Sequence, residues 1–523
     1  MATHVVPSVG ARFKLHDSIG TIRYAGPVDD TTGIWLGVEW DDPKRGKHDG
    51  VKDGKRYFSC RIPNSGSFIR QSANINYGNS FLSALYAKYV ELPRAASSQL
   101  EKVLLGSSNG AIEVEAVDLD KIREKFSHLD RLREISLDNE LVARLDEDPE
   151  TIRTTCPSVR GLDLSQSLIP EWNVIASICT GMPSLQRLAL NRNRLSIWTD
   201  ILSADCAFLN LIELRLNGTL TTWQEMQQLV RCMPVLKAVE LGYNLISDVS
   251  NAEGHPALET VNLDSNQLKQ WTQICDTLSA YPSLDRLVLT TNRIEEIPLP
   301  AQRRLAIRHL SLSYNLLSSW RNIDALPLWC PALESLTLAG NPLFNEPGPA
   351  QLGVRHFVIA RISSLVTLDA AHISPQERTD CELMYLSHIA RSTSDADRTR
   401  LHPRWDELCQ KHGRPEEPDV GQKQDKLSKR LVDPELELFK GSPDDPPDAS
   451  ATVKLRALPS MSLGALRSKI LKTLKHSPNH TRITLWLRMD HNSFTLLESD
   501  RDSQDLAWLG IENGSVLRFV IES

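Results

Sequence analysis

Residues 185–195 read LQRLALNRNRL, and this spacing of leucines around one asparagine returns along the middle of the chain. Strong copies begin at positions 236, 258, 284, 307 and 333, and weaker copies begin at 132, 159 and 211. The nine units follow one another at intervals of 22 to 27 residues. The strong copies share an asparagine at their ninth position, which stands at Asn193, Asn244, Asn266, Asn292, Asn315 and Asn341. Repetition at such a period predicts a stack of similar coils, because one unit alone has no partner for its leucine face.

The pattern resembles the leucine-rich repeat, in which each unit adds one short strand to a parallel, concave sheet. The resemblance implies that the leucines point inward and that the asparagine bonds the bend of the neighbouring coil. Helical spacing across residues 223–233 and 271–280 predicts short helices on the convex side. Three tryptophans stand five residues after a repeat asparagine, and this regular placement indicates core residues at Trp198, Trp271 and Trp320.

The concave face of such a solenoid consists of the strand positions that flank the inward leucines. These positions carry charges of both signs, at Glu134, Arg187, Glu213, Arg215, Glu240, Asp264, Arg286 and His309. Mixed charge on this surface fits a protein partner, and it fits an ordinary solvated face equally well. We predict that the contacts with a folded partner lie among Arg187, Arg215, Glu240, Asp264 and Arg286.

The repeat array ends in a pattern that is typical of a cap. Residues 355–362 predict a helix followed by a last strand. A further helix is predicted to begin after Ser374, because Pro375 then takes the first helical position and Glu377 the capping-box position. Residues 392–449 lose the pattern and are rich in charge and proline, so we predict a linker with a few helical turns there.

Residues 450–523 predict a third compact module. An amphipathic helix at 462–474 is surrounded by strand-like stretches at 452–457, 483–487, 494–497 and 516–520. This order resembles the α+β ubiquitin-like β-grasp. The segment lacks the diglycine ending of a conjugated modifier, so we expect a fixed docking module.

The N-terminal part carries the loop Gly46-Lys47-His48-Asp49-Gly50 among short apolar pieces that are rich in aromatic residues and glycine. Glycine at this density marks tight turns and close backbone approach, so we predict a small all-β barrel with a cationic loop beside an aromatic groove. Such a loop is suited to holding an anion. A phosphate loop is disfavoured, because no serine or threonine follows Lys47.

These stretches resemble the CAP-Gly family. Residues 33–40, 46–50, 56–60 and 65–70 stand in that family's order. CAP-Gly domains bind the acidic, aromatic C-terminal tails of α-tubulin and of end-binding proteins. The resemblance implies that Lys47 and His48 meet the terminal carboxylate of the tail, while Trp35 and Phe68 line the groove for its last side chain. The predicted tail site consists of Trp35, Gly46, Lys47, His48, Asp49, Gly50, Phe68 and Arg70.

Two positions depart from the family pattern. His48 stands where the family usually has asparagine, and an imidazole that becomes charged near pH 6 to 7 is expected to make tail binding more sensitive to pH. Asp30 stands where many relatives carry an apolar residue. An acid at this place is expected to weaken the binding of an acidic tail or to change its register.

The composition excludes several classes of protein. A net charge of -7 over 523 residues offers no basic face for nucleic acid or for anionic membrane lipid. The nine cysteines stand singly, which is typical of a reduced, intracellular protein without a disulfide framework or zinc site. We find no secretory signal, no membrane span and no catalytic constellation or cofactor motif at a recognised spacing. We therefore expect a cytoplasmic, cytoskeleton-associated protein that is not an enzyme.

The order of the three modules resembles that of the tubulin-folding cofactors. The predicted parts are a CAP-Gly domain at 1–95, a leucine-rich-repeat solenoid with its cap at 100–391, the linker at 392–449 and a ubiquitin-like domain at 450–523. The resemblance implies a chaperone that binds α-tubulin and the αβ-tubulin heterodimer and acts with tubulin cofactors B, C and D. The alternative hypothesis is an adaptor of microtubules or of the ubiquitin pathway, which reaches the proteasome through its ubiquitin-like end.

Overall fold

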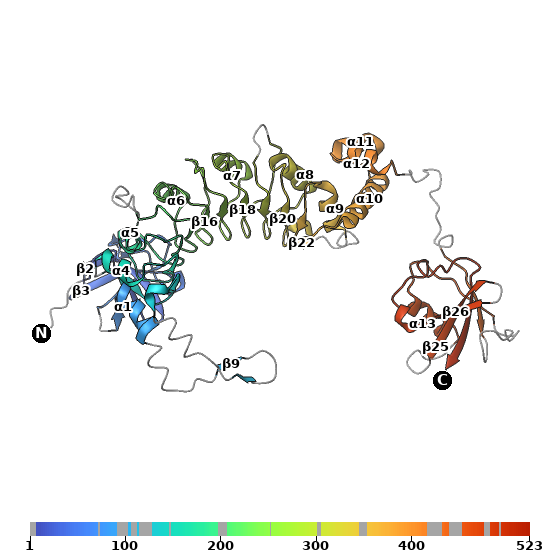
Figure 1. Cartoon of the computed structure of the whole chain (residues 1–523), viewed down its shortest axis with the longest axis horizontal. Coiled ribbons are helices and arrows are strands. Elements are labelled where there is room, and N and C mark those ends of the chain that lie inside the picture. The colour runs from blue at the N-terminus through green and yellow to red at the C-terminus, as the bar shows by residue number, and fades with distance from the viewer. Residues whose placement is uncertain are drawn as a thin grey trace. The chain divides into compact units, whose positions relative to one another are not determined.

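The chain forms two compact units, Met1–Pro415 and Glu416–Ser523. Figure 1 shows their elements in a computed structural model. The structure describes residues 7–71, 74–91, 103–105, 112–114, 128–145, 148–196, 207–250, 253–300, 305–344, 353–415, 431–438, 452–474, 482–490 and 493–522. Among these residues, no helix is both long enough and apolar enough to span a membrane.

The N-terminal module is a small β-structure with one apolar core. Its five-stranded sheet has the order β6-β3-β2-β1-β7, from the strands β1 (Arg12–Leu15), β2 (Ser18–Pro27), β3 (Ile34–Trp40), β6 (Gly66–Ile69) and β7 (Ile75–Asn76). The short strands β4 (Val51–Lys52) and β5 (Lys55–Arg56) form a separate hairpin. The core contains Phe13, Ile22, Leu36, Val38, Trp40 and Ile75. The predicted all-β fold of this part is confirmed.

The solenoid of the first unit has an eleven-stranded sheet in chain order, apart from β12. Its nine repeat strands are β11 (Glu134–Ser136), β13 (Gly161–Asp163), β14 (Arg187–Ala189), β15 (Glu213–Arg215), β16 (Ala238–Glu240), β17 (Thr260–Asn262), β18 (Arg286–Val288), β19 (His309–Ser311) and β20 (Ser335–Thr337). Each pairs in parallel with the next, so the nine predicted units are confirmed. The cap adds β21 (Thr367–Leu368) in parallel and β22 (Ala371–His372) in the opposite direction.

The repeat asparagines join neighbouring coils as predicted. Asn266 is buried, and its side-chain amide donates to the carbonyl oxygens of Leu241 and Leu263 at 2.9 and 3.0 Å. Its side-chain oxygen accepts from the backbone N–H of Ile246 at 2.9 Å. The other five asparagines also donate to a carbonyl of the preceding coil. These bonds satisfy the backbone groups at each bend, which would otherwise be buried without partners.

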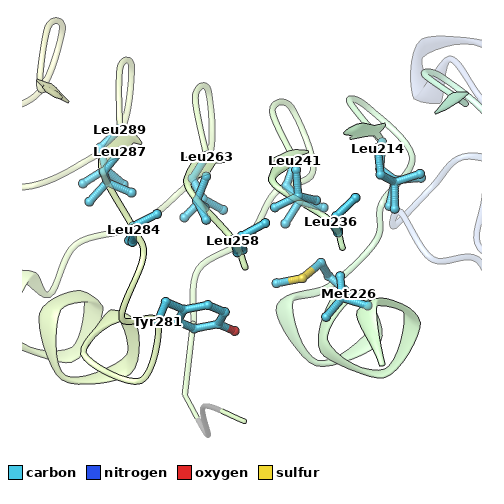
Figure 2. Packing of buried hydrophobic residues seen from close by; sticks show 14 of the residues in the cluster. Leu214, Met226, Leu236, Leu241, Leu258, Leu263, Tyr281, Leu284, Leu287 and Leu289 are labelled. Carbon is cyan, nitrogen blue, oxygen red and sulfur yellow. The ribbon is translucent and has the colours of Figure 1, made fainter. Parts of the chain in front are cut away.

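The leucines of successive coils stack into one continuous core, which Figure 2 shows with Met226 and Tyr281 closing it from the helical side. The described helices between repeat strands are α4 (Pro149–Thr155), α5 (Trp172–Thr180), α6 (Trp223–Val230), α7 (Trp271–Leu278) and α8 (Trp320–Trp329). Trp271 is buried as predicted, and Trp320 is half-buried against the core. Trp198 lies outside the described residues.

The start of the solenoid differs from the prediction, which placed residues up to 95 in the N-terminal module. Strand β8 (Asn79–Ser80) pairs in parallel with β12 (Val142–Arg144) of the first repeat. The helix α1 (Phe81–Tyr86) follows, capped by the Ser80 hydroxyl, and buries Phe81, Leu82 and Leu85 in the solenoid core. These apolar side chains cover the open end of the leucine stack, so this segment is an N-terminal cap. Further on, β9 (Val103–Leu105) and β10 (Ile112–Val114) form a hairpin.

The C-terminal cap is longer than predicted. It consists of α9 (Val354–Arg361), α10 (Pro375–Ser392), α11 (Asp395–Leu401) and α12 (Trp405–His412). The Ser374 hydroxyl accepts from the N–H of Glu377, as the capping pattern predicted. Trp405 and Leu408 of α12 pack with Tyr385 and Ile389 of α10 in a separate apolar cluster. The few helical turns predicted within the linker therefore belong to the cap, and the predicted linker begins too early. The many charged residues of α12 hide its apolar spacing.

The second unit has the strand order β24-β23-β27-β25-β26. Its elements are β23 (Glu435–Leu438), β24 (Thr452–Lys454), α13 (Leu463–Thr473), β25 (Arg482–Asp490), β26 (Ser493–Leu497) and β27 (Val516–Glu522). The strand β23 lies inside the predicted linker, yet it pairs with both β24 and β27, so the boundary at 450 was wrong. Its sequence, Glu-Leu-Glu-Leu, is short and acidic, and only Leu436 is fully buried.

Candidate functional site

A groove of about 500 Å³ opens on the N-terminal module beside the glycine-bracketed loop. It brings together four residues of the predicted tail site, Trp35, Lys47, His48 and Phe68. The rest of its lining comes from Val28, Thr31, Trp40, Arg45, Lys52, Ser67 and Ile69. The groove therefore combines an aromatic wall with cationic side chains, which suits an acidic peptide with an aromatic end.

The loop geometry explains why glycines bracket Lys47 and His48. A Cβ at Gly46 would overlap the backbone of Asn64 and Ser65, and a Cβ at Gly50 would overlap the carbonyl oxygen of Phe58. Gly50 also has a φ of 94°, which disfavours any side chain. This close approach lets the backbone N–H groups of Lys47 and His48 both donate to the carbonyl oxygen of Gly66, at 2.7 and 3.2 Å. The Lys47 side chain is left exposed at the groove.

Glu39 holds the segment 61–65, which leads into Gly66, the residue that the loop 46–50 contacts. Its buried carboxylate accepts from the backbone N–H of Arg61 at 2.6 Å and of Ile62 at 3.2 Å. Arg23 supplies an ion pair to the same carboxylate at 2.7 Å. Because residues 61–65 lead directly into Gly66, Glu39 holds the backbone that positions Lys47 and His48. Sequence analysis did not single out Glu39.

His48 is held in one tautomer by a local hydrogen bond. Its Nδ1 accepts from the backbone N–H of Gly50 at 3.0 Å, so the neutral ring carries its proton on Nε2 and can donate to a ligand. Burial lowers the pKa of His48 below 6.5, and the nearby Lys47 ammonium lowers it further, against the opposite effect of Asp49. We therefore expect tail binding to depend on pH below the predicted range of pH 6 to 7. The neutral ring presents a donor as an asparagine amide would.

Arg70 supports the aromatic wall instead of reaching into the groove. Its guanidinium stacks on the Trp35 ring at 3.9 Å from the centroid and donates to the carbonyl oxygen of Ile34 at 3.1 Å. The Trp35 indole N–H donates to the Thr31 hydroxyl at 2.8 Å. These two contacts fix the plane of Trp35. Thr31 had no recognisable sequence signal, because only the fold brings it under the indole.

The remaining polar residues fall into two groups. Arg45 and Lys52 add cationic side chains to the lining, and their places next to the glycine bracket were the signal that sequence analysis passed over. Asp49 lies outside the lining and forms an ion pair with Arg56 at 3.2 Å. Asp30 is exposed, has a φ of 59° and is likewise absent from the lining, so its effect on tail binding stays a prediction.

We expect His48→Asn to preserve binding of an acidic aromatic tail peptide, because asparagine can also accept from the Gly50 N–H and donate to the ligand. His48→Leu should weaken binding about fivefold, which corresponds to roughly 1 kcal/mol for a lost neutral hydrogen bond. Peptide titration of both variants measures the difference.

The same titration against pH follows the protonation of His48. Affinity should stay level from pH 7 to 8 and change below pH 6.5, when a proton on Nδ1 breaks the bond from Gly50. Because folding favours the neutral ring, the module should also lose stability as the pH falls through this range. A transition centred above pH 7 would contradict the assignment, and His48→Asn should remove the transition.

Some of the residues predicted to contact a partner on the concave sheet form ion pairs with neighbouring side chains of the sheet. Arg187 of β14 pairs with Glu134, and Arg215 of β15 pairs with Glu213 at 2.5 Å and Glu240 at 3.4 Å. A groove of about 460 Å³ is lined by residues of β11, β13, β14 and β15 and by Tyr89, which follows α1 in the chain.

The other two predicted contacts differ in their surroundings. Asp264 follows β17, and burial raises the pKa of its carboxyl, with the Glu240 carboxylate adding to the effect. Arg286 of β18 is exposed and has no ion pair among the described residues. It is therefore the contact whose charge is most available to a partner. No three His, Cys, Asp or Glu side chains in the described ranges gather closely enough to hold a metal ion.

The comparisons with known proteins agree with this architecture. The CAP-Gly domain family matches residues 9–74. The chain is 30% identical to the tubulin-specific chaperone E of Bos taurus over 97% of this chain and 98% of that protein. It is 34% identical to the tubulin-specific chaperone E of Danio rerio over 79% and 81%. A solved structure of the Bik1 CAP-Gly domain with an ETF peptide from Bim1 is 36% identical, covers 12% of this chain and 75% of that chain, and has a TM-score of 0.11.

The similarity to the bovine protein spans almost the whole of both chains, and the resemblance that the sequence suggested is thereby confirmed. The chain belongs to the tubulin-specific chaperone E family.

Proposed function

We propose that the chain is a tubulin-folding chaperone that binds α-tubulin at two places, the C-terminal tail in the N-terminal groove and the folded body on the concave sheet. The groove is the observation that carries the proposal. It sets the exposed Lys47 ammonium and the His48 donor beside the aromatic surfaces of Trp35 and Phe68. The relatives named as tubulin-specific chaperones support the same function.

Each part of the groove has a distinct role in holding the tail. Lys47 pairs with the terminal carboxylate, and the Nε2–H of His48 donates to the same group. Trp35 and Phe68 contact the last aromatic side chain, while Arg45 and Lys52 attract the acidic residues that precede it. One charge-assisted hydrogen bond contributes roughly 1.5 to 3 kcal/mol. Micromolar binding needs about 8 kcal/mol, so the aromatic contacts and the concave sheet supply the rest.

The join between the two modules makes the two contacts act together. The strand β8 and helix α1 are built into the solenoid, and β7, the last strand of the N-terminal module, ends three residues before β8. A short connection keeps the second site close after the first has bound, which raises its effective concentration. Tail capture is thereby expected to favour docking of the tubulin body on the solenoid.

Binding of α-tubulin at these two sites would allow the chain to take part in both assembly and dissociation of the αβ-tubulin heterodimer. A protein that holds α-tubulin can hand it to β-tubulin or withdraw it, according to which complex is more stable. We propose that tubulin cofactors B, C and D are the other participants. Binding energy drives this exchange, and the proposal assigns no catalytic residue.

Arg286→Glu tests the concave sheet. Because Arg286 is exposed and free of ion pairs in the described part of the chain, reversing its charge should slow dissociation of the heterodimer without disturbing the fold. Arg215→Glu is a poorer test, because it also breaks the pairs with Glu213 and Glu240. The measurement is the rate at which purified heterodimer dissociates. An unchanged rate with Arg286→Glu would show that the folded body of α-tubulin does not contact β18.

A further inference from the structure

Two tyrosines stand at the same place in two repeats and are unusually open to solvent. Tyr243 precedes the repeat asparagine of the fifth unit, and Tyr314 precedes that of the eighth. Both side chains are 63% exposed. Each is followed two residues later by a leucine, Leu245 at 50% and Leu316 at 43% exposure. The two Tyr–Leu pairs form what is here named the tyrosine edge, at the side of the solenoid where the strands end.

The fold does not require aromatic residues at this position. The other seven repeats place Asn139, Gln166, Arg192, Gly218, Ser265, Thr291 and Gly340 there. Every one of these residues, like the two tyrosines, has a φ between 52° and 76°. A left-handed backbone is costly for a bulky side chain and easy for glycine. Because most repeats carry a non-glycine residue here, the backbone does not select tyrosine, and the two exposed rings add no packing to the core. They are best explained by a role outside the fold.

The tyrosine edge is a surface prepared for contact. The Tyr314 ring lies over Gly340 of the next repeat, where a Cβ would overlap the ring. Support from the neighbouring coil limits the ring's freedom, so less conformational entropy is lost when a partner covers it. The two Tyr–Leu pairs are three repeats apart, and neighbouring strands are about 4.8 Å apart, which separates the pairs by roughly 14 Å. One protein face can cover both pairs.

The residues between the pairs indicate the chemistry of the partner. Ser265 and Gln267, then Thr291 and Arg293, hold the equivalent positions of the two intervening repeats, and these four side chains carry one charge. The carboxylate of Asp264 lies against Gly242 beside Tyr243. The cationic groove that suits an acidic tail lies on the N-terminal module and not at the tyrosine edge. The tyrosine edge instead offers exposed aromatic and aliphatic groups, which dominate the binding energy of interfaces between folded proteins. Its partner is an apolar protein face.

The strands β16 and β19 run from the concave sheet directly into the tyrosine edge, so a body held on the sheet also reaches the edge. Subunits of stable dimers bury faces that are more apolar than ordinary surface. We propose that the tyrosine edge binds the apolar face of α-tubulin that β-tubulin covers in the heterodimer. This inference rests on the proposed function, and it makes the chain a competitor of β-tubulin for one surface.

The variant Tyr243→Ser with Tyr314→Ser tests the proposal, because serine already occupies this position at Ser265. We expect unchanged affinity for a tail peptide and an unchanged melting temperature. Capture of α-tubulin that lacks its tail should fall at least tenfold, and dissociation of the heterodimer should slow. The matched control is Val235→Ser with Leu328→Ser, which removes apolar side chains of 42% and 44% exposure elsewhere on the solenoid. The control should capture tailless α-tubulin normally.

The outcomes separate the inference from the function on which it rests. Capture of tailless α-tubulin within twofold of the unaltered protein, or an equal loss in the control, would overturn the tyrosine edge. Failure of the unaltered protein to capture intact α-tubulin would instead overturn the proposed function. Hydrogen exchange of α-tubulin in the complex should show protection of the segments that face β-tubulin in the heterodimer. Protection confined to other segments would also overturn the inference.

Discussion

Phe81→Ala should destabilise the solenoid by about 3 to 5 kcal/mol, the usual cost of replacing a fully buried phenylalanine. Phe81 is completely buried in the solenoid core although it follows the N-terminal module in the chain. Its ring covers the open end of the leucine stack together with Leu82 and Leu85, so its loss exposes the first repeats to water. Denaturation followed by circular dichroism measures the loss.

The matched control is Phe13→Ala, which removes an equally buried phenylalanine from the core of the N-terminal module. Phe13→Ala should abolish binding of a tail peptide, whereas Phe81→Ala should leave that binding nearly unchanged under native conditions. If Phe81→Ala abolished tail binding and left the repeats stable, the segment would belong to the N-terminal module after all. The pair of variants thus locates the boundary between the two modules.

Lys47→Ala should weaken binding of an α-tubulin tail peptide by roughly 10- to 150-fold. The estimate follows from the 1.5 to 3 kcal/mol that a charge-assisted hydrogen bond contributes. The fold should be unaffected, because the Lys47 side chain is exposed and, among the described residues, only its backbone N–H forms a hydrogen bond. Calorimetric titration with the peptide measures the change, and added salt should reduce the difference between the two proteins.

The control for Lys47→Ala is Lys44→Ala, which removes an exposed cation from the short turn Pro43–Arg45 just before the loop. Lys44 lies outside the groove lining. Lys44→Ala should lower the affinity for the peptide by less than twofold, through the loss of general attraction. Equal losses in the two variants would show that the peptide responds to overall charge. The carboxylate would then not be held by Lys47 in particular.

The solenoid could be predicted from sequence because its physical requirements repeat. Every coil needs leucines in the core and a side chain such as Asn266 to satisfy its bend, so the same spacing appears many times. The caps at the two ends of the array do not carry the repeated spacing, and the predicted boundaries of the solenoid were wrong there. Phe81 was assigned to the preceding module, and α12 was assigned to a linker, since neither segment carries the repeat pattern.

The candidate tail site was predicted only in part for a related reason. Lys47 and His48 stand in a recognisable motif, and the structure places both on the groove. Thr31 and Glu39 act by supporting other groups, through the Trp35 indole and through the backbone at Arg61. A supporting residue is defined by what the fold brings near it, and its own sequence neighbours reveal little. Similarly, β23 became recognisable only as the partner of β27.

The most direct test of the account compares intact α-tubulin with α-tubulin that lacks its last residues, each against the unaltered chain and Lys47→Ala. We predict that removal of the tail weakens binding at least as much as Lys47→Ala, because the tail also contacts His48, Trp35 and Phe68. We also predict that Lys47→Ala has no further effect once the tail is gone, because Lys47 acts only through its contact with the tail. Equal binding of both tubulins, or an undiminished effect of Lys47→Ala on tailless α-tubulin, would contradict the account.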